Sequence, residues 1–559
     1  MLQTPADSTL CAALFAPDSP TVEALEAQYP PRELPEGAAV TRFAPSPTGF
    51  LHFGGLFGAF ADRLTASGSG GVFILRIEDT DKKREVEDGV SGIVEGLRFF
   101  CIKIDEGVVG FEQERGAYGP YTQSRRRLIY HAVAKRLVEQ GLAYPCFCTE
   151  EELDELRARQ ETAGVNKGYY GKWTRCRDLP LEEQLRRVRA GEAYTLRLRS
   201  QGDGSQRITV PDLIRGKLEL PENNMDVVLL KADGIPTYHF AHVVDDHFMR
   251  VTHVIRSDEW LANLPLHIAL FRACGFKPPK YAHTAPVMKE ENGGKRKLSK
   301  RRDPEAAVSY FAAQGYPPYC VQEYLLTLLN SGFEDWRRAN PRAMLEDYPF
   351  QLKKLSPSGA LFDLPKLEDV CKNVLALYSA EEVYALGLAW AKEHDAELAA
   401  LLERDPDYAK ALLSIDRGGA KPRKDLARMS QLREYVSYFY DALYQPGFTL
   451  PEHIAAEDAA RILAAYARVY SPADDKETWF AKIKALCAPL GFSPDVKEFK
   501  RNPGQWKGHV GDVTTVLRLA VTARRNTPDL WAIMRALGEE RLCARLQNAL
   551  ALFAESHIY

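Results

Sequence analysis

Two short segments of the chain carry the residue types that hold a polyphosphate anion. The first, residues 41–55, reads TRFAPSPTGFLHFGG and places His52, Gly54 and Gly55 where a turn meets a helical pattern. The N–H groups and dipole of a helix N-terminus attract anions, and glycine lets phosphate approach the backbone. The second, residues 295–302, reads KRKLSKRR and supplies mobile cations. Because neither GxGxxG nor GxxxxGK[ST] is present, each segment alone favours a plainer interpretation, an ordinary βα turn and a solvated basic loop.

A guanidinium group and a carboxylate are predicted at neighbouring strand ends. Arg42 closes one apolar run, and the acidic string EDTD begins at Glu78, directly after the next apolar run. Ligands of open α/β sheets bind at the carboxyl ends of strands. A carboxylate suits an ammonium group, and the planar fork of arginine suits a carboxylate. We therefore expect Arg42 and Glu78 to bind an amino-acid ligand; the alternative is that Thr80 or Asp81 simply caps a helix from Lys82.

Three cysteines have a spacing that fits a metal site. Cys146 and Cys148 form a CxC pair, and Cys176 follows in the string YYGKWTRCR. Thiolates are preferred zinc ligands, so the three cysteines predict a candidate zinc site with Tyr170 as the fourth ligand. The alternative is three buried free thiols.

The hydrophobic pattern indicates the elements that position these residues. An apolar run at 38–43 stops at two prolines, which cannot continue a central strand. Apolar residues at helical spacing follow at 56–64, and a second apolar strand covers 72–77. This order predicts a βαβ unit whose turn lies at the carboxyl end of the first strand. We also expect a helix at 21–28, a helical pattern from 121, strand-like segments over 227–260, and mainly helices beyond 302.

Composition limits the class of protein. With 559 residues, the chain is too long for one core, and we expect roughly three to five domains. The net charge of −3 provides no bulk attraction to nucleic acid, so any RNA surface must come from local patches such as GAKPRKDLAR (419–428) and LRLAVTARRNTPDLW (517–531). No signal peptide or membrane segment is predicted. Ten scattered cysteines predict reduced thiols in a cytoplasmic protein.

Taken together, the two phosphate-binding segments resemble the signature motifs of class I aminoacyl-tRNA synthetases. HFGG at 52–55 is similar to the "HIGH" motif, and KLSKR at 297–301 is similar to "KMSKS". The longer strings APSPTGFLHFGG and RIEDTD narrow the resemblance to the glutamyl-tRNA synthetase family, from residue 41 to the C-terminus. The resemblance implies a multidomain α/β plus all-α fold: a Rossmann-type parallel-sheet catalytic domain with an α+β insertion, then helical anticodon-binding domains.

The same resemblance predicts where the domains begin and end. We expect an N-terminal leader at 1–38, the two halves of the Rossmann catalytic domain at 39–121 and 231–278, an inserted acceptor-arm-binding domain at 122–230, a stem-contact domain carrying the KLSKR loop at 279–375, and helical anticodon-binding subdomains at 376–470 and 471–559.

The family's functional residues map onto matching positions of this chain. By resemblance, His52 and Lys300 are catalytic, and ATP is bound by His52, Gly54, Gly55, Glu259, Lys297, Ser299, Lys300 and Arg301. Glutamate is bound by Arg42, Ala44, Ser46, Glu78, Tyr238, His242 and Arg256. His242 stands where many members carry asparagine, and a histidine there is expected to hydrogen-bond a carboxylate, more strongly if protonated.

The resemblance implies a two-step reaction without a covalent enzyme intermediate. Glutamate attacks the α-phosphate of ATP, with Mg²⁺ accompanying the nucleotide, and a terminal ribose hydroxyl of tRNA(Glu) then attacks glutamyl-AMP. Zinc is present in some members and absent in others. We expect a monomer that does not bind membranes.

Several alternatives stay open from sequence. A non-discriminating enzyme would also charge tRNA(Gln). A truncated tRNA-modifying relative, or a small nucleotidyltransferase, would lack the helical C-terminal half. A non-catalytic paralogue would be expected to lose His52 or Lys300, and both are present.

Overall fold

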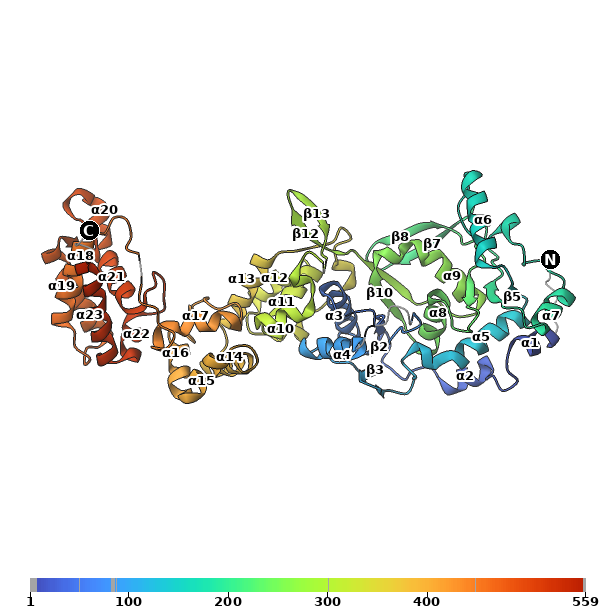
Figure 1. The fold of residues 1–559 in the computed structure, drawn as a ribbon, viewed down its shortest axis with the longest axis horizontal. Coiled ribbons are helices and arrows are strands. Elements are labelled where there is room, and N and C mark those ends of the chain that lie inside the picture. The colour runs from blue at the N-terminus through green and yellow to red at the C-terminus, as the bar shows by residue number, and fades with distance from the viewer. Residues whose placement is uncertain are drawn as a thin grey trace. The chain divides into compact units, whose positions relative to one another are not determined.

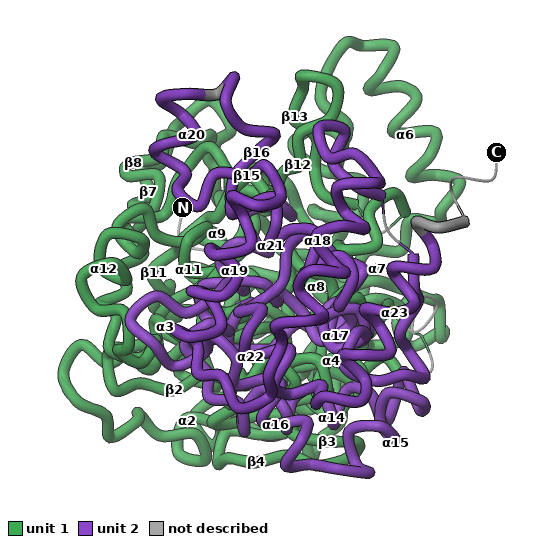
Figure 2. Tube along the Cα trace, turned by 90° about the vertical axis from the view of Figure 1, so that its left-hand side faces the viewer, with its two compact units in different colours: residues 1–310, 322–363 green, residues 311–321, 364–559 purple. Residues whose placement is uncertain are grey.

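The computed structural model describes residues 8–49, 51–81, 86, 88–299, 301–447 and 449–555. The chain divides into two compact units (Figures 1 and 2). Unit 1 comprises residues 1–310 and 322–363, and unit 2 comprises residues 311–321 and 364–559. The finer domain boundaries expected from the sequence stay predictions.

The predicted βαβ unit is present at the start of the catalytic sheet. Strands β1 (Val40–Phe43) and β2 (Val72–Leu75) are parallel and are joined through α3 (Phe53–Ser67). Strand β3 (Glu106–Gly110) continues the sheet in parallel, and β4 (Gln113–Arg115) adds an antiparallel edge. The runs VTRF and VFIL are almost wholly buried, as expected for a parallel sheet covered on its faces.

The sheet order reverses at β1. Strand β10 (His253–Ser257) pairs in parallel with β11 (Lys280–Thr284). Thr252, directly before β10, donates its N–H to the Val40 carbonyl at 3.0 Å, so β10 follows β1 on the side opposite β2. Strands β7 (Arg207–Asp212) and β8 (Gly216–Pro221) form a hairpin beside β11. In open α/β sheets such a reversal is where ligands bind, at the carboxyl ends of the strands.

The strand-like expectation for 227–260 is correct for its two ends and wrong for its centre. Strands β9 (Val228–Leu230) and β10 form, but Tyr238–Phe248 is helix α8. The buried residues Phe240, Val243, Val244 and Phe248 of this helix follow helical spacing. The valine pair and the aromatic residues suggested a strand because these residue types have high strand propensity. The helical period of the buried face is the stronger signal, and it agrees with α8.

The insertion between the two halves of the sheet has its own small sheet. Strand β6 (Thr195–Leu198) lies between β5 (Ala143–Cys146) and β9, antiparallel to both. Helix α6 (Glu150–Thr162) starts with a capping box formed by Thr149 and Glu152. The other helices of this part are α5 (Arg127–Glu139) and α7 (Leu181–Arg189).

A hairpin presents the basic segment. Strands β12 (Val287–Glu291) and β13 (Gly294–Lys297) are antiparallel, and β14 (Ala360–Phe362) pairs with β12. Asn292 and Gly293 both have positive φ, 52° and 76°, as a two-residue type I′ turn requires. The hairpin ends at Lys297, so the KLSKR segment begins where the strand stops.

The remaining helices of unit 1 include two in the leader. The expected helix at 21–28 is confirmed as α2 (Val22–Gln28), with Thr21 as its N-cap. The helix expected from Lys82 lies outside the described residues. The other helices that lie wholly in unit 1 are α1 (Ser8–Leu14), α4 (Gly89–Phe99), α9 (Leu264–Ala273) and α12 (Phe333–Ala339).

Unit 2 is almost entirely helical, which confirms the helical region predicted beyond 302. Helices α10 (Val308–Gln314) and α11 (Pro318–Leu329) each have residues in both units. Helices α13 to α23 are Leu364–Leu375, Ala380–His394, Ala396–Arg404, Pro406–Ser414, Leu432–Val436, Ala456–Val469, Lys476–Leu490, Val496–Arg501, Val510–Thr522, Leu530–Leu537 and Glu539–Glu555. Within the described ranges, none of the helices combines the length and the apolar character that crossing a bilayer requires.

Candidate active site

The turn before α3 is shaped by His52. The His52 side chain is the N-cap of α3, and its Nδ1 accepts a hydrogen bond from the Gly55 N–H at 3.0 Å. In the neutral imidazole, Nδ1 as acceptor places the proton on Nε2. A Cβ at Gly54 would lie 3.0 Å from His52 Cε1. Glycine at position 54 therefore leaves room for the imidazole ring over the helix N-terminus.

The chain that follows the KLSKR segment returns to the HFGG turn within unit 1. Ala307 forms a β-bridge with His52, and the Val308 N–H donates to the Leu51 carbonyl at 3.3 Å. The chain that leaves the KLSKR segment thus runs beside the HFGG turn. Lys300 itself lies outside the described residues, so its predicted catalytic role stays a prediction.

Asp303 holds the KLSKR segment in place. Its carboxylate is 2% exposed and accepts hydrogen bonds from Arg296 at 2.6 and 2.8 Å and from the Ser299 N–H at 2.9 Å. Hydrogen bonds from Arg296 keep the pKa of Asp303 well below its usual range. Lys297, one of the predicted ATP ligands, forms an ion pair with another, Glu259. The side chain of Arg301 is exposed.

The segments that follow β1 and β2 are hydrogen-bonded to each other. Arg42 lies near the carboxyl end of β1, and Glu78 follows the neighbouring β2, as the sequence predicted. The Glu78 N–H donates to the Pro45 carbonyl at 3.0 Å. Ala44 and Ser46 lie in the segment that follows β1, and Ser46 is exposed.

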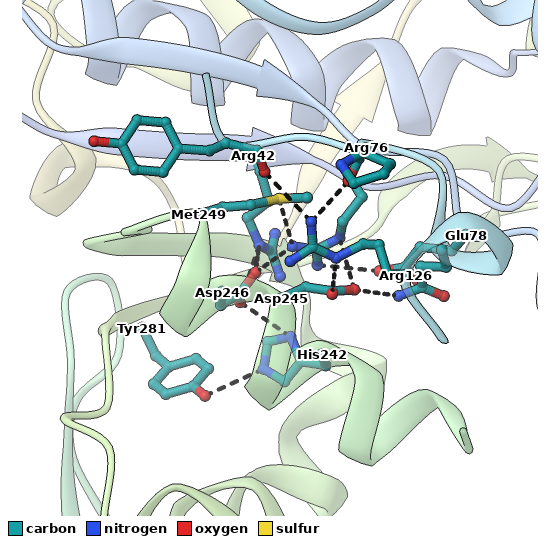
Figure 3. A network of polar contacts seen from close by, with 12 residues as sticks. Arg42, Arg76, Glu78, Arg126, His242, Asp245, Asp246, Met249 and Tyr281 are labelled. Carbon is teal, nitrogen blue, oxygen red and sulfur yellow. Dashed lines mark hydrogen bonds and ion pairs between the residues drawn. The ribbon is translucent and has the colours of Figure 1, made fainter. Parts of the chain in front are cut away.

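Arg42 is buried against α8. The Nε atom of Arg42 lies 3.3 Å from both carboxylate oxygens of Asp246 (Figure 3). Burial disfavours the charge of Arg42, but Asp246, together with Asp62 and Tyr238, outweighs this effect, so the pKa of the arginine is raised. No described residue accepts a hydrogen bond from the Nη atoms of Arg42, so they are available to a ligand.

Arg76 was not predicted as a site residue, although it lies at the centre of the charged network (Figure 3). Its side chain is fully buried, and it donates to Asp246 at 2.6 Å and to Glu78 at 3.1 Å. Its Nε also lies 3.8 Å from Asp245. The available signals were a charged residue inside the buried run VFILRI and the acidic pair in VVDDHF. Neither signal reveals that the two segments meet.

Asp245 binds a further group of buried side chains, which lies behind the network of Arg76 and Asp246. Arg126 donates to Asp245 at 2.5 Å, Gln123 at 2.9 Å and Tyr130 at 3.0 Å. All four side chains are buried. Because Asp245 and Asp246 are adjacent on α8, this group fixes the helix that carries the partner of Arg42 and Arg76.

The carboxyl group of Glu78 has a raised pKa. Burial raises the pKa of this carboxyl group from 4.5 to about 7, against the opposing attraction of Arg76 and Arg42. Its side chain is only 6% exposed. An ammonium group placed beside Glu78 would restore the charged form, as expected for a carboxylate that binds an amino acid.

His242 is neutral, and both of its ring nitrogens lie near side chains of the protein. The side chain is fully buried, with Nδ1 3.1 Å from Asp246 and Nε2 3.3 Å from the Tyr281 hydroxyl. Burial lowers the pKa of His242 to about 3. His242 thus lies beside a carboxylate of the protein, Asp246, while its predicted contact with the carboxylate of glutamate stays a prediction. Burial disfavours the protonated form considered from the sequence.

Arg256 is a buried cation whose hydrogen-bond partners are imidazoles rather than carboxylates. It is 8% exposed, and its hydrogen bonds go to two imidazoles, His283 Nε2 at 3.0 Å and His267 Nδ1 at 3.0 Å. Among the described residues, no carboxylate forms an ion pair with Arg256, and none accepts a hydrogen bond from its buried Nη2. Burial lowers the pKa of Arg256. Of the other predicted residues, Tyr238 stacks on Trp260 with ring centroids 4.3 Å apart.

The three predicted thiols come together in the insertion. The Cys146, Cys148 and Cys176 sulfur atoms all lie within 4.8 Å of one another. The Tyr169 hydroxyl lies 3.6 Å from Cys146 and 3.5 Å from Cys148. The neighbouring Tyr170 points elsewhere, because its hydroxyl donates to the Asn166 carbonyl. All ten cysteines are free thiols.

Unit 2 contains a pocket of about 230 Å³. It is formed by parts of the two basic strings noted in the sequence, 419–428 and 517–531, together with a short helical segment. The Tyr438 hydroxyl is buried there without a described partner. The polar and aromatic lining includes Arg423, Gln431, Tyr435, Tyr438, Arg524 and Asn526.

Two matches to known families agree with this architecture. Residues 38–363 match the catalytic domain of tRNA synthetases class I (E and Q). Residues 506–550 match the anticodon binding domain. The chain therefore belongs to the class I tRNA synthetases of the E and Q group.

Named relatives specify the activity. The chain is 52% identical over 522 residues to a glutamate–tRNA ligase of Acetivibrio thermocellus, covering 93% of this chain and 95% of that one. It is 47% identical over 529 residues to the glutamate–tRNA ligase of Clostridium perfringens SM101, covering 94% and 96%. A crystal structure of a glutamate–tRNA ligase from Elizabethkingia meningosepticum in complex with its amino acid aligns with a TM-score of 0.73 at 28% identity, covering 92% and 99%. The activity of this protein is that of a glutamate–tRNA ligase.

Proposed function

We propose that the buried guanidinium of Arg256 binds a carboxylate of L-glutamate, while Glu78 binds its ammonium group. The observation that carries this proposal is the missing counter-charge: a cation buried beside neutral imidazoles, with one Nη unpaired, is disfavoured until an anion arrives. Arg42, which uses only Nε on Asp246, offers its Nη atoms to the second carboxylate. An arginine for each carboxylate accounts for a dicarboxylic substrate.

In the same proposal, ATP binds at the two signature segments, HFGG and KLSKR. His52 Nε2 and the N–H groups at the start of α3 face the phosphates, and Lys297 and Lys300 neutralise the charge that develops on the leaving pyrophosphate. The protein mainly positions the reactants, since the glutamate carboxylate is itself the nucleophile. Mg²⁺ accompanies ATP and supplies charge neutralisation when bound. In this arrangement Lys297 exchanges Glu259 for phosphate when ATP binds.

The anticodon of tRNA(Glu) is assigned to unit 2, with the 230 Å³ pocket as the place for one unstacked base. Its aromatic and amide groups suit a base, and the unpaired Tyr438 hydroxyl offers a hydrogen bond. The cations there are already neutralised, Arg423 by Asp425 and Arg524 by Glu434. The pocket therefore favours a base over a phosphate. A non-discriminating enzyme that also charges tRNA(Gln) is the alternative.

The thiol cluster fits a structural zinc ion in the insertion. Tetrahedral zinc with Zn–S bonds of about 2.3 Å requires sulfur atoms roughly 3.8 Å apart, and Cys148 and Cys176 are 3.7 Å apart. Hydrogen bonds from Cys148 and Cys176 lower the pKa of Cys146, while hydrogen bonds with Cys146 raise the pKa of Cys148 and of Cys176. Tyr169 is the protein group nearest to a fourth ligand position. Elemental analysis of the purified protein tests this: about one zinc per chain is expected, lost in Cys148→Ser and kept in the control Cys101→Ser.

Two assays test the proposed roles. Glutamate-dependent ATP–pyrophosphate exchange should show a KM for glutamate at least about a hundredfold higher in Arg256→Gln, and no change in Arg272→Gln, whose side chain is 61% exposed on α9. Equal KM values in Arg256→Gln and wild type would exclude Arg256 as a glutamate ligand. Aminoacylation of separate tRNA(Glu) and tRNA(Gln) transcripts with labelled glutamate then distinguishes a discriminating enzyme, which charges only the first, from a non-discriminating one.

A further inference from the structure

Arg256 is held by two neutral imidazoles, and the hydrogen-bonded network that includes them comes from four different elements. His283 on β11 and His267 on α9 each accept one hydrogen bond from the guanidinium, at 3.0 Å. Behind His283, its Nδ1 lies 2.7 Å from the carboxylate of Asp212 at the end of β7. Behind His267, its Nε2 lies 3.0 Å from Nδ1 of His239 on α8.

The direction of every hydrogen bond in this chain is determined. A guanidinium group only donates, so His283 Nε2 and His267 Nδ1 must both be unprotonated acceptors. His283 then carries its proton on Nδ1 and donates it to Asp212, and His267 carries its proton on Nε2 and donates it to His239. Both imidazoles are fully buried, and burial lowers the pKa of each, which keeps them neutral.

The carboxylate of this network is kept away from the arginine. Asp212 is buried and also accepts hydrogen bonds from the backbone N–H groups of His283, Ile214 and Arg215, which fix it behind His283. His283 therefore separates the anion from the cation. A simple core ion pair would place the carboxylate directly on the guanidinium, as Asp246 does for Arg42 and Arg76.

We propose that His267 and His283 are positioning residues that orient the guanidinium of Arg256 without neutralising it, so that the substrate carboxylate provides its counter-charge. This inference rests on the proposed role of Arg256 in binding glutamate. Two acceptors, on Nε and on Nη1, fix the plane of the guanidinium group and leave Nη2 for the ligand. A protein carboxylate in the same place would hold the arginine equally well but would compete with glutamate.

A pair of nearly isosteric variants tests this directly. In His267→Asn, the amide oxygen can replace Nδ1 as acceptor, so the KM for glutamate should stay within about threefold of wild type. In His267→Asp, the same position carries a carboxylate that pairs with Arg256, so the KM for glutamate should rise roughly tenfold or more. The KM for ATP should change by less than about twofold in both, because only the glutamate subsite is altered.

Thermal unfolding of the free enzyme provides the readout that a purely structural role would not produce. His267→Asp should unfold at a temperature no lower than His267→Asn, because the new carboxylate compensates a buried cation while it weakens glutamate binding. The inference is overturned if the Asp and Asn variants have the same KM for glutamate, or if the Asp variant loses binding only together with its fold. A second pair, His283→Gln and His283→Glu, repeats the comparison at the other acceptor.

Arg256→Gln separates this inference from the proposal on which it depends. If Arg256→Gln binds glutamate normally, the role proposed for Arg256 is wrong and the positioning role falls with it. If Arg256→Gln loses glutamate while His267→Asp and His283→Glu do not, Arg256 remains the ligand and only the positioning role is refuted.

Discussion

Replacing Glu78 by glutamine should stabilise the free protein and weaken glutamate binding. Burial raises the pKa of Glu78 from 4.5 to about 7 in the folded protein. Between these two pH values the unfolded chain releases the Glu78 proton while the folded protein keeps it, so folding becomes less favourable as the pH rises. At roughly 1.4 kcal/mol per pH unit, the full penalty above pH 7 is about 3 kcal/mol.

The glutamine side chain removes this penalty and keeps the local contacts. Its amide oxygen can accept the hydrogen bond that Arg76 donates to Glu78 at 3.1 Å, and Arg76 retains Asp245 and Asp246 as charge partners. Urea denaturation of wild type and Glu78→Gln at pH 8 should therefore show the variant more stable by about 3 kcal/mol. At pH 4, where Glu78 is protonated in the folded protein, the difference should vanish.

Glutamate activation should respond in the opposite sense. Without the carboxylate, the substrate ammonium group loses its counter-charge, and ATP–pyrophosphate exchange should require at least about tenfold more glutamate. In wild type, the KM for glutamate should rise as the pH falls below about 7, because protonated Glu78 no longer attracts the ammonium group. A variant that is less stable than wild type at pH 8, or a stability difference that does not depend on pH, would refute this reasoning.

Three further changes test other parts of the site. Asp246→Asn leaves Arg42 and Arg76 with one fewer buried counter-charge, and urea denaturation should show a loss of about 3 kcal/mol; an unchanged midpoint would contradict the network. Asp303→Asn releases Arg296 and the Ser299 N–H, and turnover should fall about tenfold at unchanged KM for glutamate; parallel changes in both would point to a general loss of folding. Lys300→Ala should lower turnover by about a hundredfold while glutamate binding measured by calorimetry stays near wild type, as expected for a partner of transition-state charge.

Several features of the fold could be predicted from the sequence because their signals are local. Two prolines after an apolar run, a glycine turn and helical spacing lie within a few tens of residues, and they predict β1, α3 and β2 without knowledge of the rest of the chain. The motifs HFGG and KLSKR identify the family because catalysis requires particular residue types at fixed spacing within each motif. The helix around Tyr238 was missed because its valines and aromatic residues also suit a strand, and the buried face of α8 appears only once its neighbours are known.

The class of enzyme, the order of the elements around HFGG and the residues that carry the motifs could thus be predicted from local sequence. Which charges meet depends on how the chain folds: Arg42 and Asp246 are 204 residues apart, and Arg76 and Asp246 are 170 apart. The tertiary structure also decided that Tyr169 rather than Tyr170 faces the thiols, and that imidazoles rather than a carboxylate hold Arg256. The physical reason is that ionisation and hydrogen bonding depend on burial and on neighbours brought together by folding, and neither quantity is encoded in the spacing of residues along the chain.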